Sequence, residues 1–281
     1  MLTTEKISEL ISTIKIYTNF DFSQYAVSSF TRRIEKILED NNIDVDKFIK
    51  QIKKSDKLFV DKLIADITVN TTELFRDPSV WQSIKYRILS KYEQATSIDI
   101  WHVGCSTGQE VYSMLILLNE LNLLEKTNIY ATDINNFALQ NAQQGKFIYR
   151  FNAEYLQNFD EVIKKNPYNF EEFNDVPYSK YFFIDKAKDI IQINDFLRNK
   201  AVFVNHDITS LYNIFEKKFD IILCRNVLIY FNQILQSKVI NFFYDNLRYP
   251  GNLVLGYHES ILGNESLKFH KKHFYYTKRP I

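Results

Sequence analysis

Glycine is distributed unevenly along this chain of 281 residues. All six glycines lie at or after Gly104, and none occurs in the first 103 residues. Tight turns and close approaches of the backbone to a ligand most often require glycine. A helix-patterned leader without glycine, followed by short apolar segments joined by glycine turns, predicts two domains. We therefore expect an N-terminal helical domain over 1–75 and a sheet domain over 76–281.

Amphipathic helices are predicted in the leader, because apolar residues recur there at spacings of three and four. The three groups of apolar positions are Ile7, Leu10, Ile11 and Ile14; Val27, Phe30, Ile34, Ile37 and Leu38; and Val45, Phe48, Ile49 and Ile52. A further helix is expected to start at Asp77-Pro78. Asp77 would be its N-cap, and Pro78 would occupy the first helical position.

Strands and helices alternate from about residue 98 onward. The segments that resemble strands are 98–103, 128–132, 201–204, 219–224 and 252–256, with a possible last strand at 273–277; the helical ones are 107–121, 134–144 and 237–247. We expect Pro250-Gly251 to form a turn. This alternation is typical of an α/β domain with a doubly wound parallel sheet. The aromatic stretch of mixed charge at about 151–200 is predicted to be an insertion in the sheet domain.

Charge and hydropathy exclude several classes of protein. A formal net charge of +1 argues against general nucleic-acid binding, which requires clustered Lys and Arg. No apolar run reaches the roughly 18 residues that span a bilayer, so direct membrane insertion is not expected. The polar start MLTTEKISEL lacks the pattern of a secretory signal, and Cys105 and Cys224 are too few for a disulfide framework. We expect a cytoplasmic monomer with two free thiols.

Two segments indicate where a ligand would bind. In open parallel sheets, ligands lie beyond the carboxyl ends of the strands. The first strand ends in a loop with Gly104 and Gly108, where the backbone can approach a ligand closely. The second strand ends at Asp133, 29 residues after Gly104, where a carboxylate can bind the two hydroxyls of a ribose. On these residues alone, an aspartate that caps a helix over a tight turn remains an alternative.

The same loop also matches the G-x-S-x-G nucleophile elbow of α/β-hydrolases. Ser106 would be the nucleophile, with Asp207 or Asp220 and His258 completing a triad. However, this loop follows the first strand of the alternating region, with no earlier strands to build the hydrolase sheet. The hydrolase hypothesis also gives the segment 70–76 no role.

Four ordered motifs carry a resemblance to a known family. They are NTTELFRDP at 70–78, which matches N-x-T-x-F-F-R except at Leu74; STGQEVYS at 106–113, which matches S-T-G-E-E-P-Y-S; ATDI at 131–134; and CRNVLIYF at 224–231, which matches C-R-N-V-M/L-I-Y-F. With these motifs the chain resembles the chemotaxis-receptor glutamate methyltransferases, the CheR family, over nearly its whole length.

The resemblance implies a fold and an activity. The fold would be a class I, Rossmann-like S-adenosylmethionine methyltransferase sheet domain with an inserted small β-subdomain and an N-terminal helical domain. The activity would be a protein-glutamate O-methyltransferase that uses S-adenosyl-L-methionine, releases S-adenosyl-L-homocysteine and forms glutamyl methyl esters on chemotaxis receptors. The alternative is a catalytically silent relative that binds the cofactor as a signalling module.

The resemblance also assigns roles to individual positions. The predicted cofactor-binding residues are Asn70, Thr72, Arg76, Gly104, Glu110, Asp133, Asp207, Ile208 and Asn226. Gly104 is included because its loop lets the backbone approach a ligand, and the others because the resemblance implies them. Arg76 can orient the acceptor carboxylate through its planar fork of donors, and Tyr230 would lie beside the transferred methyl. A structural ion pair for Arg76 and core packing for Tyr230 are the alternatives.

The predicted partner is the acidic helical region of a chemoreceptor. Arg32, Arg33 and Lys36 on the second helix are predicted to recognise it, together with Lys47, Lys50 and Lys54 on the third. A solvated helix surface is the alternative for these residues.

Some positions depart from the family pattern. Gln109 replaces the first of two paired acids, and Gly256-Tyr257-His258-Glu259-Ser260 replaces the usual G-H-S-E. The insertion contains no glycine, so tethering to a receptor tail is not predicted. His270 and His273 form H-x-x-H without a third ligand, and no metal site is predicted.

Overall fold

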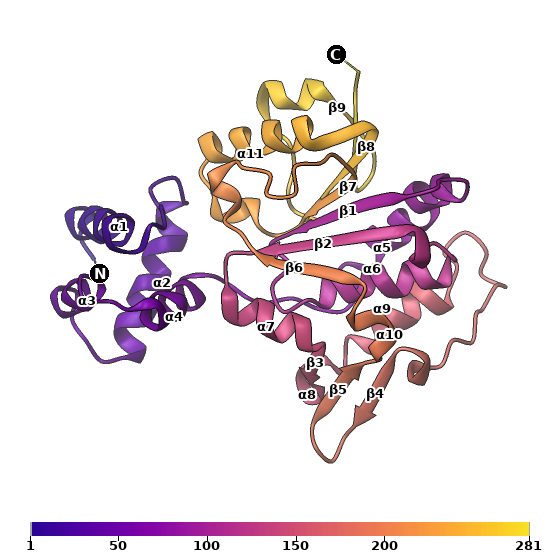
Figure 1. Ribbon diagram of the computed structural model, residues 1–281, viewed down its shortest axis with the longest axis horizontal. Coiled ribbons are helices and arrows are strands. Elements are labelled where there is room, and N and C mark those ends of the chain that lie inside the picture. Colours follow the sequence, from indigo (N-terminus) through magenta and orange to yellow (C-terminus); the bar gives the residue numbers. More distant parts are fainter. Residues whose placement is uncertain (1, 281) are drawn as a thin grey trace.

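The computed structural model describes residues 2–280. Its first four helices are α1 (Thr4–Thr18), α2 (Val27–Asp40), α3 (Val45–Ile52) and α4 (Lys57–Ile67). They pack around a core of their own, which extends from Ile7 to Ile67. Thr3, Asp44 and Asp56 cap α1, α3 and α4 by accepting a backbone N–H with their side chains. The helices form a separate lobe beside the rest of the chain (Figure 1).

A seven-stranded sheet forms the centre of the larger lobe. Its strands are β1 (Ile98–Val103), β2 (Thr127–Asp133), β6 (Ala201–Asn205), β7 (Phe219–Cys224), β8 (Leu247–Leu255), β9 (Phe269–Lys271) and β10 (Tyr276–Lys278), in the spatial order β6-β2-β1-β7-β8-β10-β9. The first five strands in this order pair in parallel, whereas β10 and β9 are antiparallel to their neighbours. The direction of winding reverses between β1 and β7. This topology confirms the predicted α/β fold class.

Helices cover both faces of the sheet (Figure 1). On one face lie α5 (Pro78–Ser83), α6 (Gln109–Glu120) and α7 (Asn136–Gln144), and on the other lies α11 (Gln233–Asn246). Short helical segments complete the lobe: α8 (Tyr149–Asn152), α9 (Leu156–Phe159), α10 (Asp195–Arg198), Ile84–Ile88, Leu89–Tyr92, Leu124–Lys126, Asp160–Lys164, Tyr178–Lys180, Ile208–Ser210, Leu228–Tyr230 and Gly263–Lys268. All six residues of β1 are buried, as expected for a strand covered on both faces.

The predicted insertion contains a small antiparallel sheet. It consists of β3 (Lys146–Ile148), β4 (Phe182–Asp185) and β5 (Ile190–Ile193), in the order β3-β5-β4. The sheet starts at Lys146, ahead of the predicted boundary at 151. It lies below α7 and away from the N-terminal helices in Figure 1. We propose a domain boundary between Ile67 and Leu74, because these residues belong to different cores.

Three local predictions need correction. Asp77 does not cap α5 with its side chain: its φ of 58° is left-handed, and its carboxylate instead accepts from Arg225. Pro250-Gly251 does not separate two elements but lies inside β8, where the pairing with β7 shifts register. The last strand is Tyr276–Lys278 rather than 273–277. Within residues 2–280, no helix is long and apolar enough to cross a membrane.

Candidate active site

A cavity of about 380 Å³ lies where the helical lobe meets the carboxyl ends of the parallel strands. Of the predicted site residues, those that line it are Arg32, Arg33, Asn70, Thr72, Arg76, Gly104, Glu110, Asp133, Asp207, Ile208, Asn226 and Tyr230. They come from α2, from the connection after α4, from the first turn of α6, from the end of β2, and from the segments that follow β1, β6 and β7. The exceptions are Lys36 on α2 and the lysines Lys47, Lys50 and Lys54, which are exposed and do not line the cavity.

The loop after β1 brings its backbone against the neighbouring strand end. Gly104 has a left-handed φ of 72°, and its N–H donates to the Thr132 carbonyl at 2.8 Å. A Cβ at this position would overlap Val227 Cγ2. Glycine is therefore required here both by conformation and by space, and the missing side chain leaves room at the cavity wall.

Asp133 is held at the end of β2 by backbone donors. Its Oδ2 accepts from Ser106 N at 2.7 Å, and its Oδ1 accepts from Asn135 N at 2.9 Å. Burial raises the pKa of this carboxyl, although the backbone hydrogen bonds oppose the shift. Asn135, not Asp133, caps α7. Each carboxylate oxygen retains acceptor capacity, so Asp133 can accept from two ligand hydroxyls.

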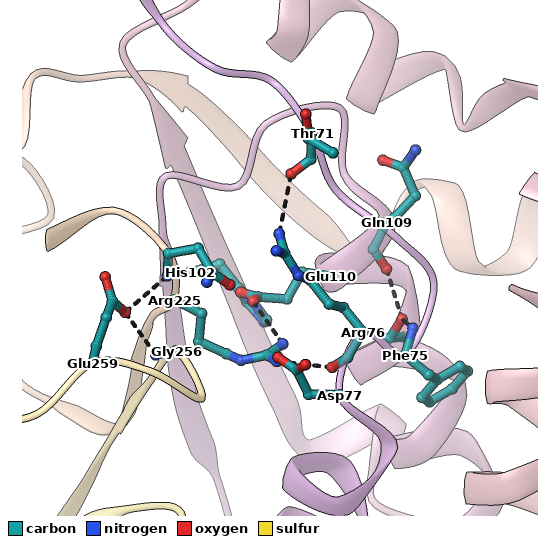
Figure 2. A network of polar contacts seen from close by, with 12 residues as sticks. Thr71, Phe75, Arg76, Asp77, His102, Gln109, Glu110, Arg225, Gly256 and Glu259 are labelled. Carbon is teal, nitrogen blue, oxygen red and sulfur yellow. Dashed lines mark hydrogen bonds and ion pairs between the residues drawn. The ribbon is translucent and has the colours of Figure 1, made fainter. Parts of the chain in front are cut away.

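The segment that carries Arg76 is fixed by contacts from the sheet domain. Phe75 and Asp77 both have left-handed φ angles, of 50° and 58°. Arg225 Nη2 donates to the Arg76 carbonyl and to Asp77 Oδ2, both at 2.8 Å, and Phe75 N donates to Ser113 Oγ at 2.8 Å (Figure 2). The Arg76 backbone is thereby immobilised, while its guanidinium is half-buried at the cavity and donates to the Thr71 carbonyl at 3.5 Å.

Glu110 belongs to a buried polar network at the base of the cavity (Figure 2). His102 Nδ1 lies 2.8 Å from Glu110 Oε1, and Arg225 Nη1 donates to Glu110 Oε2 at 3.3 Å. Burial opposes ionisation, but the hydrogen bond from His102 and the charge of Arg225 together lower the pKa of Glu110. The carboxylate is therefore ionised at neutral pH and can accept from an amino group of a ligand.

Three arginines, Arg32, Arg33 and Arg76, line the same cavity as Tyr230. Burial raises the pKa of the Tyr230 hydroxyl, and Arg33, Arg76 and Arg32 oppose that shift with their positive charge. Within residues 2–280, none of these arginines forms an ion pair with an acid. Guanidinium groups that lack an acidic partner at one cavity form a site for an anion.

Glu259, within the altered motif at 256–260, supports the site from outside the cavity lining. Its carboxylate accepts from Asn226 N at 2.8 Å, Gly256 N at 2.7 Å and Ile229 N at 3.2 Å. These bonds hold the loop after β7, in which Asn226 has a left-handed φ of 59°. The altered 256–260 motif therefore still supports the loop that leads to Tyr230.

Several lining residues were missed by sequence reasoning, among them Tyr25, Thr68, His206, Arg225 and Val227. Arg225 and Val227 lie within the fourth motif, so their position next to Asn226 was an available signal. No local pattern singled out Tyr25. Conversely, Gln109 points away from the cavity toward Asn152, so its departure from the family acid alters packing.

The structure does not assemble a hydrolase triad. The Ser106 hydroxyl is buried without a hydrogen-bond partner among the described residues. His258 is exposed against Tyr257, Asp207 accepts from Thr209 N, and Asp220 pairs with Arg248. His270 and His273 join no group of three metal-ligating residues within 2–280.

Comparisons with known proteins match most of the chain. The family model described as CheR methyltransferase, SAM binding domain, matches residues 70–276. A putative methyltransferase Cher3 from Pseudomonas putida is 33% identical over 257 residues, which cover 91% of this chain and 89% of the relative. A chemotaxis protein methyltransferase from Listeria innocua is 30% identical, with 89% and 87% covered.

Solved structures give more distant matches. The plantazolicin methyltransferase BpumL in complex with a pentazolic analogue and SAH shares 14% identity with a TM-score of 0.38, covering 94% of this chain and 68% of that one. PKMT2 from Rickettsia typhi in complex with AdoHcy shares 14% identity with a TM-score of 0.37, covering 67% and 26%.

Proposed function

Because the chain belongs to the CheR methyltransferase family, we propose that it methylates glutamate side chains on a chemotaxis receptor and thereby forms glutamyl methyl esters. The observation that carries this proposal is the group of three arginines that line the cavity with Tyr230, since a glutamate carboxylate is the anion that such a site would hold. An acidic helical region of the receptor is the proposed partner.

The residues at the cavity fit S-adenosylmethionine. Asp133 offers acceptors for ribose hydroxyls, and Glu110 offers an ionised carboxylate for the amino group of the methionine part. Ile134 and Ile208 provide apolar wall, and Gly104 allows close approach to the backbone. The volume of about 380 Å³ lies within the roughly 300–1,000 Å³ of small-molecule sites.

Bound S-adenosylmethionine supplies an electrophilic methyl group on a sulfonium. The acceptor glutamate has an ordinary pKa of about 4.3 and is ionised at neutral pH, so the protein need not supply a base. The role of Arg76, with Arg33 at the same cavity, is to orient the carboxylate through a fixed fork of donors. Positioning reacting atoms in this way lowers the barrier by several kcal/mol, up to about 7–11 kcal/mol in well-aligned systems.

Tyr230 has a different role from the arginines. Its raised pKa keeps the hydroxyl protonated at neutral pH, so it acts as a hydrogen-bonding group and not as a base. The backbone of Tyr230 is anchored, since its carbonyl accepts from Ala26 N at 2.8 Å. The hydroxyl is therefore held beside the anion site, where it can orient the reacting oxygen.

The proposal is tested by the alkali lability of the product. The protein is incubated with S-adenosylmethionine labelled in the methyl group and with the cytoplasmic part of a chemoreceptor. Glutamyl esters release volatile labelled methanol in base, whereas methylated amines keep the label. We expect base-labile label on the receptor; base-stable label, or no label on any acceptor while the protein binds the cofactor, would contradict ester formation.

Asp133→Asn is expected to weaken binding of S-adenosylhomocysteine about 100-fold, because an amide replaces a charged acceptor of two hydroxyl hydrogen bonds. Two effects on the stability of the ligand-free protein oppose each other. The raised pKa of Asp133 means that its charge lowers stability at neutral pH, whereas the amide leaves either Ser106 N or Asn135 N without its acceptor. Calorimetry gives the affinity, and thermal unfolding gives the stability. Unchanged affinity would remove Asp133 from the cofactor site.

Charge reversal on α2 tests receptor recognition. Arg32→Glu with Arg33→Glu is expected to lower kcat/KM for the receptor at least 10-fold and to flatten its dependence on salt, because attraction to acidic helices is lost. Lys47→Glu with Lys50→Glu is the matched control on α3, where both lysines are exposed and away from the cavity. An equal loss in the two double variants would argue for a diffuse charge effect instead of a specific site.

A further inference from the structure

The N-terminal domain contributes a wall to the cavity that the cofactor would occupy. Tyr25 lines the cavity, yet it precedes α2 and lies outside residues 70–276, which match the S-adenosylmethionine-binding family model. We propose that Tyr25 is a cofactor-contacting residue, and that it couples the position of the N-terminal domain to cofactor binding. This inference rests on the proposed cofactor site.

The position of the Tyr25 hydroxyl supports a contact with the cofactor. Burial and the nearby carboxylates of Asp207 and Asp133 raise its pKa, so the hydroxyl remains protonated beside the two acids predicted to bind adenine and ribose. Within residues 2–280 this hydroxyl makes no hydrogen bond to another protein group. A donor that faces a cavity without a protein partner is available to a ligand.

The ring of Tyr25 is packed from both domains. It lies edge-on to Phe22 of the N-terminal domain, at 4.8 Å between centroids, and to Phe231 of the sheet domain, at 5.2 Å. Such pairs contribute about 0.5–1.5 kcal/mol beyond their buried area. The ring therefore has a defined orientation at the cavity wall.

The backbone beside Tyr25 joins the two domains. Tyr25 and Phe231 form an antiparallel bridge, in which Ala26 N donates to the Tyr230 carbonyl at 2.8 Å and Asn232 N donates to the Gln24 carbonyl at 2.9 Å. The N-terminal domain is thus bonded directly to the loop that carries Tyr230. A ligand that contacts Tyr25 must also favour this docked arrangement of the domains.

The same short stretch of chain leads to the predicted acceptor site. Ala26 is the N-cap of α2, and Arg32 and Arg33 follow on that helix and line the cavity near Tyr230. The Tyr25 end of the stretch lines the same cavity as Asp133 and Asp207, and the arginine end lines it together with Tyr230. Cofactor affinity and acceptor docking on α2 are consequently expected to influence each other.

The first test is calorimetry with S-adenosylhomocysteine. Tyr25→Ala is expected to bind at least about 10-fold more weakly than the wild type, and Tyr25→Phe about 3-fold more weakly, because the latter loses only the hydroxyl hydrogen bond. Tyr17→Ala is the matched control, since Tyr17 is half-exposed on α1 and does not line the cavity. Wild-type affinity in both Tyr25 variants would overturn the contact.

The second test uses the unaltered protein and does not depend on how the variants fold. Hydrogen exchange is followed with and without S-adenosylhomocysteine in the segments 22–32 and 226–236, with 45–52 on α3 as the control. We expect slower exchange in the first two segments and no change in α3. Protection of 226–236 alone would show that the N-terminal domain takes no part. Absence of binding by the wild type would overturn the proposed function, and this inference with it.

Discussion

Arg76→Ala is expected to lower the rate of methyl transfer on the order of 1,000-fold, which corresponds to about 4 kcal/mol of lost transition-state stabilisation. The physical reason is the loss of the donor fork that holds the acceptor carboxylate at the cavity. The backbone of residue 76 would remain in place, because Arg225 and Ser113 bind the chain around it through carbonyl and N–H groups. Single-turnover kinetics with labelled S-adenosylmethionine and saturating receptor measure the effect.

Two further variants define what Arg76 contributes. Arg76→Lys keeps the charge but not the planar fork, so we expect it to recover less than a tenth of the lost rate. Arg87→Ala serves as the matched control, since Arg87 is exposed and bonded to Tyr168 far from the cavity. Affinity for S-adenosylhomocysteine should change only a few-fold in Arg76→Ala. Full activity in that variant would remove Arg76 from the mechanism.

The sheet and its ligand-binding edge were predictable from local sequence. Strands covered on both faces appear as continuous apolar runs, and β1 coincides with the predicted segment 98–103. The residues at strand ends, such as Gly104 and Asp133, follow directly from those runs. Because carboxyl ends of parallel strands meet at one edge, the strand pattern alone places Gly104 and Asp133 at one cavity, whereas the other predicted site residues came from the family resemblance.

Contacts between distant segments were not predictable in the same way. The sequence suggested that Asp77 caps α5, but Arg225, 148 residues further on, takes its carboxylate. Glu110 was expected to contact the cofactor, and its pairing with His102 had no local signal. Tyr25 reaches the cavity only because the two domains dock through its backbone bridge to Phe231. Each of these depends on packing between elements, which periodicity within one element does not encode.

The network around Arg225 joins several of these distant segments. Its guanidinium is 2% exposed and binds Glu110, Asp77 and the Arg76 carbonyl at once. It also lies over the Trp81 ring. Buried charges of this kind are satisfied only together, since removing one partner leaves the others unpaired in a medium of low dielectric. We regard Arg225 as a positioning residue that keeps Arg76 and Glu110 in place.

Arg225→Ala is therefore expected to reduce both stability and activity. Leaving Glu110 and Asp77 without their buried partner should cost about 3–5 kcal/mol of unfolding free energy. At roughly 2–4 °C per kcal/mol, the midpoint of thermal unfolding should fall by about 10 °C. At a temperature where the variant is still folded, kcat should fall on the order of 100-fold, because the segment 75–77 loses the bonds that hold Arg76.

Arg248→Ala is the matched control, since Arg248 bridges Asp99 and Asp220 away from the cavity. That variant should lose stability and keep its kcat when folded. Wild-type kcat in folded Arg225→Ala would show that the network stabilises the fold without positioning Arg76.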